Sequence, residues 1–407
     1  MTNNVNAAVE YTTKQIGSYL FKIEHRTSPQ HFTRESDLGF KNTALLILRL
    51  IKKSLKAELM DYFYQHSDVE KIPSRQAFSQ AREKLSYLAF KDFFEKTCEL
   101  AVDNGNDRLY KGYRIFAVDG TVFAVGDLTK LSSYFGATTT IKDKAMCRIN
   151  AIVDVLNDCI VNASVSPFCV GERALAIDQI KQLEHVRHAL FLFDRGYWSP
   201  VLAATIMQGG QKFLMRLPSN VHNIVVKDAD GNVIPLRRYT FVLPGGDTEI
   251  LLTNIAETEM SDDELAALYT RRWGVETKYL ELKDRLQINK LSGESINTVL
   301  QDIYATMYVS NLVAFMCYES DEAIKAREAD KNNLYKQKTN RTTCISTFRR
   351  RFIDICLILD TPTRNDALKR LYQDISKDVV YIGKSKPRPR NVRQIKASRL
   401  VRRSSVL

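Results

Sequence analysis

The spacing of apolar residues changes character near residue 110. Before that point apolar residues recur every three or four positions, as on one face of a helix, most densely over residues 43–64. A second periodic stretch covers residues 74–94, and Ser74 is a residue type that caps helix N-termini. The pattern predicts a helical N-terminal region in which two helices are joined by a short segment containing Pro73.

Beyond residue 110, short apolar runs and alternating patterns predict strands separated by helices. The expected strands cover residues 115–118, 147–156, 159–165, 189–193 and 212–216, and the expected helices cover 173–186 and the stretch from Ser199 to Gly209. Asn157–Asp158 is typical of a tight turn between the second and third strands. This order predicts an α/β fold whose mixed sheet is covered by helices on both faces.

A second β-rich segment follows at residues 218–254, with turn residues at Asp230–Gly231 and Gly245–Gly246. The helical pattern resumes at Ser261, which forms a capping-box pattern with Glu264. The remaining chain is helical in pattern to about residue 374.

Composition adds an uneven charge to this picture. The 407 residues carry a net charge of +12, and nine Lys or Arg with no acid lie between Lys384 and Arg403. Such a block either binds a polyanion or is a solvated end without a specific partner. The seven cysteines form no CxxC pair, the first residues show no signal pattern, and no apolar run approaches the roughly 18 residues of a membrane span. We therefore expect a soluble cytoplasmic protein with reduced thiols.

The predicted N-terminal helices leave two interpretations open. They could form a helix-turn-helix-like module with Arg75, Gln76 and Gln80 at the exposed start of the second helix, or they could form a plain helical bundle.

The most informative segment is the predicted helix at residues 268–286. At about 100° per residue, Tyr269, Arg272, Glu276 and Lys283 fall within an arc of roughly 60° on one face. Such a face could hold a metal ion through its carboxylate and phosphate oxygens through the other three side chains. The alternative is a solvated face with Arg272 and Glu276 paired.

Two further carboxylates favour the first interpretation. Asp119 and Asp194 each directly follow an apolar run that predicts a strand. Carboxylates at strand ends lie where ligands bind on mixed sheets, although each alone could be a turn or cap residue. Together with Glu276 they form a ligand set without His or Cys, which suits Mg²⁺ or Mn²⁺. Two such ions about 4 Å apart can support phosphoryl transfer.

These segments resemble the DDE transposases of the insertion sequence 4 family. The resemblance rests on VDGT at 118–121, FDRGY at 193–197, and Tyr269-x2-Arg272-x3-Glu276-x6-Lys283, which matches the family's YREK signature. SRQAFSQAREKL at 74–85 is similar to the family's helical N-terminal region.

The resemblance implies an RNase H-like catalytic core interrupted by a β-rich insertion. The expected organisation begins with a helical DNA-binding region at residues 1–110. The catalytic core follows in two parts, 111–217 and 260–320, with the β-rich insertion at 218–259 between them. A helical C-terminal region at 321–383 and a basic tail at 384–407 complete the chain.

The same resemblance implies the chemistry and the partners. Asp119, Asp194 and Glu276 would coordinate two Mg²⁺ or Mn²⁺ ions, and Tyr269, Arg272 and Lys283 would contact phosphates of the transposon end. The protein would be a bacterial, nucleoid-associated transposase that pairs the ends of double-stranded DNA as a homodimer. It would free a 3′-OH at each end and then join that end to target DNA. Relatives excise their element through a hairpin intermediate, and whether this protein does so is left open by the sequence.

Two residues beside the motifs have open roles. Trp273 could stack on a base flipped from the strained end, or it could be a core tryptophan. Arg195, with Tyr197, could position the cleaved strand, or both could be structural.

Weaker candidates are also open. His185 and His188 have ligand spacing but lack a third partner, so a solvated helix end is favoured. Glu172 could supply an auxiliary acid, although a capping role is favoured. A second basic cluster could contact DNA or form a solvated face; it comprises Lys336, Lys338, Arg341, Arg349, Arg350 and Arg351.

Two rival functions are compatible with such a core. One is a nuclease or resolvase that cuts without strand transfer, and the other is a domesticated or decayed relative that only binds DNA. The YREK spacing argues against the first, and the intact carboxylates argue against the second.

Overall fold

The computed structural model describes residues 4–382 with the exception of 51, 53, 68–70, 104–107, 127–128, 137–143, 222–223, 228–229, 243–247 and 330–334. The predicted basic tail and the predicted turn at Gly245–Gly246 lie outside the described residues.

The N-terminal region is helical, as the sequence predicted. Its helices are α1 (Asn4–Gly17), α2 (Tyr19–His25), α3 (Phe40–Leu48), α4 (Leu55–His66), α5 (Arg75–Glu83) and α6 (Leu88–Asp103). The side chain of Ser74 accepts a hydrogen bond of 3.1 Å from the backbone of Ala77, which confirms the predicted cap.

Two predicted helices are each divided in the structure. The stretch 43–64 becomes α3 and α4, because Leu50 adopts a left-handed backbone with φ 55° and Arg349 of a distant helix binds its carbonyl oxygen. The stretch 74–94 becomes α5 and α6, because the residues between them turn aside and Ser86 donates a backbone bond to His25. Both breaks depend on tertiary contacts that local periodicity does not contain.

A seven-stranded mixed sheet forms the centre of the molecule, in the order β3-β2-β1-β4-β5-β7-β6. The strands are β1 (Arg114–Gly126), β2 (Ala145–Asp154), β3 (Cys159–Pro167), β4 (Ala189–Phe193), β5 (Lys212–Arg216), β6 (Arg237–Val242) and β7 (Thr248–Thr253). Strands β1, β4 and β5 are parallel, and the other pairings are antiparallel. The predicted β-rich insertion thus contributes β6 and β7, which extend the same sheet beyond β5.

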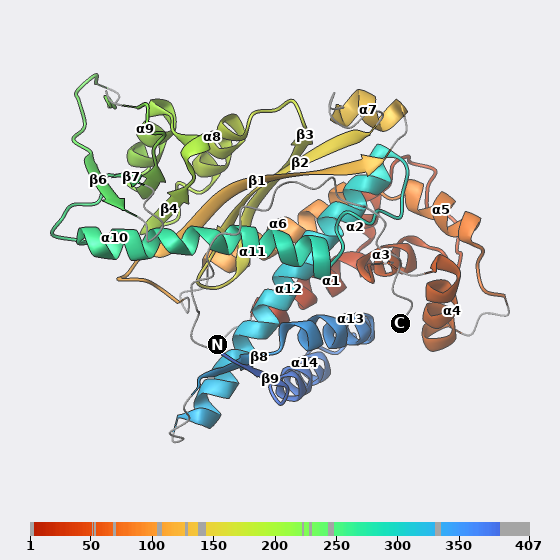
Figure 1. The fold of residues 1–407 in the computed structure, drawn as a ribbon. Coiled ribbons are helices and arrows are strands. Elements are labelled where there is room, and N and C mark those ends of the chain that lie inside the picture. Colours follow the sequence, from red (N-terminus) through yellow and green to blue (C-terminus); the bar gives the residue numbers. More distant parts are fainter. Residues whose placement is uncertain are drawn as a thin grey trace, which may run out of the picture.

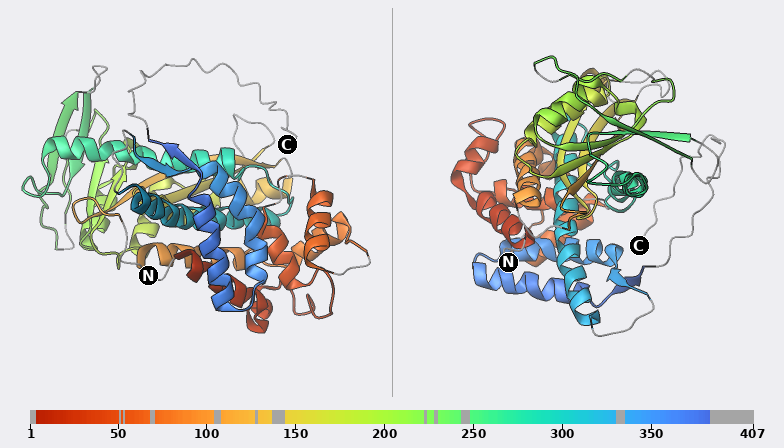
Figure 2. Two further views of the ribbon diagram at one scale, coloured as in Figure 1. Left: turned by 90° about the horizontal axis from the view of Figure 1, so that it is seen from below. Right: turned by 90° about the vertical axis from the view of Figure 1, so that its left-hand side faces the viewer.

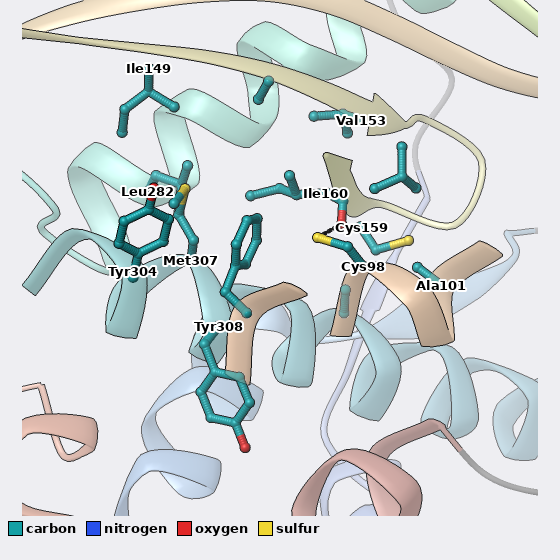
Figure 3. Packing of buried hydrophobic residues seen from close by; sticks show 14 of the residues in the cluster. Cys98, Ala101, Ile149, Val153, Cys159, Ile160, Leu282, Tyr304, Met307 and Tyr308 are labelled. Carbon is teal, nitrogen blue, oxygen red and sulfur yellow. Dashed lines mark hydrogen bonds between the residues drawn. The ribbon is translucent and has the colours of Figure 1, made fainter. Parts of the chain in front are cut away.

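Helices cover both faces of this sheet, as predicted. The helical elements between β1 and β5 include α7 (Thr129–Phe135), α8 (Glu172–Gln182), a 3₁₀ turn η1 (Arg195–Tyr197) and α9 (Pro200–Gln208). Figures 1 and 2 show α8 and α9 on one face and α11 (Trp273–Leu280) on the opposite face. The long helix α12 (Ile296–Glu328) packs on the same side as α11, and its residues Tyr304, Met307 and Tyr308 belong to one buried cluster with Ile149, Val153 and Ile160 of the sheet (Figure 3).

The helix predicted at 268–286 is a chain of short segments with one common direction (Figure 1). They are α10 (Asp262–Tyr269), a 3₁₀ turn η2 (Thr270–Arg272), α11 and a π-helical turn η3 (Glu281–Arg285). The capping box of Ser261 and Glu264 is present at its start.

The C-terminal region contains α13 (Arg341–Leu357) and α14 (Thr361–Ile375), with the small two-stranded sheet of β8 (Gln337–Thr339) and β9 (Val379–Tyr381). Among the described helices, none combines the length and apolar character needed to cross a membrane. The domain boundaries expected from the sequence stay a prediction.

Candidate functional site

Asp119 and Asp194 lie side by side on neighbouring parallel strands. The last paired residues of β1 and β4 are Val118 and Phe193, and the two aspartates follow directly. Because adjacent strands are about 4.8 Å apart and in-register side chains share a face, both carboxylates lie on the α11 side of the sheet. Asp194 ends its strand as predicted. The prediction that Asp119 ends its strand is wrong, since β1 continues to Gly126, paired with β2.

Glu276 approaches this pair from α11, and Arg272 lies between them. The Nη2 atom of Arg272 is 2.7 Å from Oε1 of Glu276, and its Nη1 atom is 3.8 Å from Oδ2 of Asp119. Arg272 is buried, with 7% of its side chain exposed, whereas the side chain of Glu276 is 39% exposed. The structure therefore brings the sequence-predicted carboxylates into one region, with a guanidinium neutralising two of them.

The environment of Asp119 disfavours its ionised form. Burial raises the pKa of Asp119 from its ordinary 3.8 to about 6, against the opposing effects of the Gly120 N–H and Arg272; Glu276 and Glu172 raise it further. Burial is the main cause of this shift, and perturbed carboxyl groups of this kind are frequent at functional sites.

The ligand types fit a hard divalent cation, since all three side chains are carboxylates. Across the described residues, however, no three His, Cys, Asp or Glu side chains lie close enough together to hold a metal ion as they stand. The present contact of Glu276 is with Arg272.

Two other residues of the YREK signature bind the sheet. The hydroxyl of Tyr269 donates a 3.2 Å hydrogen bond to the carbonyl of Phe193, next to Asp194, and the side chain is buried. The ammonium of Lys283 donates to the hydroxyl of Thr121, two residues beyond Asp119. Tyr269 is turned toward the sheet and Lys283 is half-buried beside it, and the expected contacts of these two residues with phosphates stay a prediction.

Trp273 and Arg195 are exposed near the carboxylates. Trp273 is 49% exposed, so the core-tryptophan alternative is wrong, and the guanidinium of Arg272 lies 5.1 Å from its ring centroid. Arg195 begins the 3₁₀ turn that follows Asp194 and is also exposed. Tyr197 is buried and donates to Asn150, which makes it structural in this conformation.

Sequence reasoning missed two charged residues beside Asp194. Arg216 ends β5, with Nη1 4.0 Å from Oδ1 of Asp194 and Nη2 3.0 Å from Oε1 of the buried Glu249 on β7. A signal was available for Arg216, because it follows the apolar run of its strand just as Asp194 follows its own. Glu249 lies in a segment whose pairing with β5 the sequence did not indicate.

The auxiliary acid considered at Glu172 does lie close to the site. Its carboxylate pairs with Arg148, and a Cβ atom added to Gly120 would lie 2.6 Å from its Oε1. Gly171, and not Glu172, occupies the N-cap position of α8, and no side-chain bond caps that helix. Glu172 therefore packs against the backbone next to Asp119, on the opposite face of the sheet.

Other candidates have structural explanations. His188 adopts a left-handed backbone with φ 56°, and its carbonyl accepts a hydrogen bond from the backbone of Arg114 at 3.0 Å. In the second basic cluster, Arg341 forms ion pairs and Arg349 binds backbone carbonyls, so these two do not form a solvated face. In the predicted helix-turn-helix region, Arg75, Gln76 and Gln80 are exposed, as expected.

Comparisons with known proteins agree with the resemblance seen in the sequence. Residues 110–312 match the family model of the transposase DDE domain. The chain is 22% identical to "Transposase InsG for insertion sequence element IS4" of Escherichia coli (strain K12), over 61% of this chain and 62% of that protein. It is 28% identical to "Putative transposase InsZ" of the same strain, over 34% of this chain and 47% of that protein.

The chain spans about half to three-fifths of the length of the curated relatives it matches. A solved structure titled as a piggyBac transposase synaptic complex with hairpin DNA is similar with a TM-score of 0.47 and 12% identity, over 91% of this chain and 83% of that chain. With a transposase DDE domain over residues 110–312 and distant homology to the transposase of insertion sequence element IS4, this chain belongs to the DDE transposase family.

Proposed function

We propose that this protein is the transposase of a bacterial insertion sequence, which cuts DNA at the terminal inverted repeats of its element and joins the freed ends to target DNA. The proposal is supported by the placement of Asp119 and Asp194 directly after paired residues of the neighbouring strands β1 and β4, with Arg272 in contact with both Asp119 and Glu276, all within the matched domain. On this proposal the sheet and its helices are an RNase H-like core.

The three carboxylates would hold two Mg²⁺ or Mn²⁺ ions. When bound, such ions activate the attacking oxygen and stabilise the leaving oxygen of phosphoryl transfer. The chain's own contribution is position: Asp119 and Asp194 are fixed by the β1–β4 pairing, and Glu276 is fixed by α11.

Double-stranded DNA would lie across the exposed side of this site. Trp273 and Arg195 are exposed there, and the aromatic ring of Trp273 offers a stacking surface worth roughly 1–3 kcal/mol per base. Arg272 would exchange its carboxylate contacts for a phosphate, and Lys283 lies half-buried beside β1. Tyr269 supports the site through its bond to Phe193. A homodimer would pair the two ends.

Cleavage of a labelled end duplex in Mg²⁺ tests the metal-site assignment. The duplex carries the inverted repeat that flanks the gene. We expect Asp119→Asn, Asp194→Asn and Glu276→Gln each to abolish cleavage while end binding in a mobility-shift assay persists. Asp263→Asn is the matched control, because this exposed carboxylate lies on α10 and its loss should not change cleavage. Full cleavage by any of the three variants would refute the assignment.

Two further readouts separate the rival functions. Pre-cleaved ends incubated with target plasmid should become covalently joined; cutting without joining would identify a nuclease or resolvase. Binding of the ends without any cutting by the wild type would identify a protein that only binds DNA. A closed hairpin among the cleavage products would identify the excision route.

A further inference from the structure

Four charged side chains form a closed cluster beneath the helix that carries Glu276. The ammonium of Lys278 lies 3.1 Å from Oδ1 of Asp158 and 3.1 Å from Oε1 of Glu281. The guanidinium of Arg341 pairs with the same two carboxylates, and its Nη2 atom is 3.2 Å from Oε1 of Glu281. Ser310 of α12 donates a further hydrogen bond to Glu281.

The four side chains come from three parts of the fold. Lys278 and Glu281 lie on the helix that carries Glu276, and Asp158 and Arg341 come from two other elements. Asp158 is in the turn between β2 and β3, where its backbone is left-handed with φ 56°. Arg341 is the first residue of α13 and lies outside the matched transposase domain. The cluster therefore joins the helix of Glu276 to the sheet on one side and to the C-terminal region on the other.

Two of the four side chains are shielded from water, whereas Asp158 is 42% exposed and Arg341 20% exposed. The side chain of Lys278 is 0% exposed and that of Glu281 is 7% exposed. Burial alone would raise the pKa of Glu281, but Lys278 and Arg341 outweigh it and hold that pKa below its ordinary value. Because an unpaired buried charge is strongly unfavourable, the charges must stay together for the helix to keep this place.

The opposite side of the same helix contacts the catalytic strand. Tyr279 and Lys283 bind β1 at Asp119 and Thr121, while Glu276 binds Arg272. Glu281 also begins the π-helical turn, a local irregularity that occurs frequently at functional sites. Leu282, the next residue, packs near Tyr304 and Met307 of α12 (Figure 3).

We propose that the cluster of Lys278, Glu281, Asp158 and Arg341, which we call the charge clamp, positions Glu276 and Lys283 against β1, so that the C-terminal region completes the active site. This inference rests on the proposed function. It assigns Arg341 and Glu281 as positioning residues and gives Arg341 a role other than contact with DNA.

The test is single-turnover cleavage of the end duplex by the full-length protein. Arg341→Met leaves Lys278 as the cationic partner of Glu281. Glu281→Gln keeps the shape of the side chain but removes its charge. We expect the cleavage rate at saturating DNA to fall about a hundredfold for Arg341→Met, since a misplacement of about 1 Å has an effect of this size. The KM of Arg341→Met for the duplex should stay within about twofold of the wild-type value. Arg341→Lys should recover part of the cleavage rate. The cleavage rate of Glu281→Gln should fall less than that of Arg341→Met.

Arg370→Met is the matched control. Arg370 is exposed on α14, so its loss removes the same charge from the same region without touching the charge clamp. A rate of Arg341→Met equal to that of Arg370→Met would overturn the proposal. So would a rise in KM with an unchanged rate at saturation, which is the result expected if Arg341 contacts DNA.

Tryptophan fluorescence gives a readout that does not depend on cleavage. The chain has two tryptophans, so Trp198→Phe leaves Trp273, three residues before Glu276, as the reporter. In this background, at a temperature where both proteins are folded, Arg341→Met should change the quenching of Trp273 by acrylamide and Arg370→Met should not. Identical quenching in both would overturn the proposal; if Arg341→Met does not fold, the same comparison is made with Glu281→Gln.

The cleavage results distinguish a wrong charge clamp from a wrong proposed function. If the wild type does not cleave, or if Glu276→Gln cleaves as well as the wild type, the proposed function is wrong. If the wild type cleaves, Glu276→Gln does not, and the clamp variants behave as Arg370→Met, only the charge clamp is wrong.

Discussion

The hydroxyl of Tyr279 donates a hydrogen bond of 2.7 Å to the backbone carbonyl of Asp119. It also accepts one of 3.1 Å from the backbone N–H of Ala151, the residue opposite Asp119 on β2. One side chain of α11 thus bridges the two strands at the position of the first catalytic candidate. This bridge is one of the contacts that hold Asp119 against the helix that carries Glu276, together with the contact of Lys283 with Thr121.

Tyr279→Phe should therefore weaken both the fold and the reaction. The substitution leaves a buried N–H and a buried carbonyl without this partner, which costs about 1–3 kcal/mol in the free energy of unfolding. We expect that loss in urea unfolding, together with slower cleavage at saturating DNA. Tyr64→Phe is the control, because Tyr64 is 72% exposed and should change neither quantity. Unchanged stability in Tyr279→Phe would show that the bridge contributes nothing.

Arg272→Met should remove the positive charge that now neutralises two of the carboxylates. Asp119 and Glu276 would lose the guanidinium that lies 3.8 Å and 2.7 Å from them. We expect Mn²⁺ to bind about tenfold more tightly, equivalent to about 1.4 kcal/mol, because Mn²⁺ no longer competes with the guanidinium for the carboxylates. Cleavage should be lost, since no guanidinium remains to take a phosphate.

Calorimetric titration with Mn²⁺ measures the first effect. Arg271→Met is the matched control, because the exposed Arg271 lies over the ring of Tyr110 and away from the carboxylates. Weaker Mn²⁺ binding by Arg272→Met than by Arg271→Met would contradict the expectation and would place Arg272 among the groups that organise the metal site.

Gly274→Ala should displace the helix of Glu276. A Cβ atom at this position would lie 2.7 Å from Cγ1 and 2.9 Å from Cβ of Val155, just beyond β2. Alanine in a helix is normally better than glycine by about 0.5–1 kcal/mol, but overpacking of this kind costs about 1–3 kcal/mol. We expect a net loss of stability by urea unfolding and a lower cleavage rate.

Gly17→Ala is the control for that substitution, because a Cβ atom there meets nothing within 4 Å. A more stable Gly274→Ala protein would show that Val155 moves aside at little cost.

The sequence patterns predicted the mixed sheet, but they did not indicate which side of the helix that carries Glu276 faces the sheet. Asp194 and Glu276 lie where the strand-end and helix patterns placed them, and the mixed sheet covered on both faces is confirmed. Tyr269 and Arg272 could not be assigned an inward direction, because the helical pattern orders side chains around an axis without saying which side meets the sheet. No sequence signal singled out Tyr279, whose hydroxyl bridges two strands.

Long-range partners were equally beyond a local pattern. Arg341 and Arg349 belong to a basic cluster in the sequence, and only the fold places their partners, Glu281 and the carbonyl of Leu50, beside them. The continuation of β1 past Asp119 has the same origin, since the strand is maintained by pairing with β2.

The raised pKa of Asp119 gives the metal-free protein a pH-dependent stability. Burial shifts this pKa from 3.8 to about 6, so the folded protein holds the proton more tightly than the unfolded chain does. The stabilising contribution of the protonated form is complete below about pH 4 and is lost as the pH rises through 6, a change of up to about 3 kcal/mol. Asp119→Asn cannot ionise and escapes this loss. In EDTA, its advantage over the wild type in urea unfolding should grow between pH 4.5 and 7 and then stay constant. Asp263→Asn should show no such trend, and an Asp119→Asn advantage that is independent of pH would mean that Asp119 is ionised without penalty.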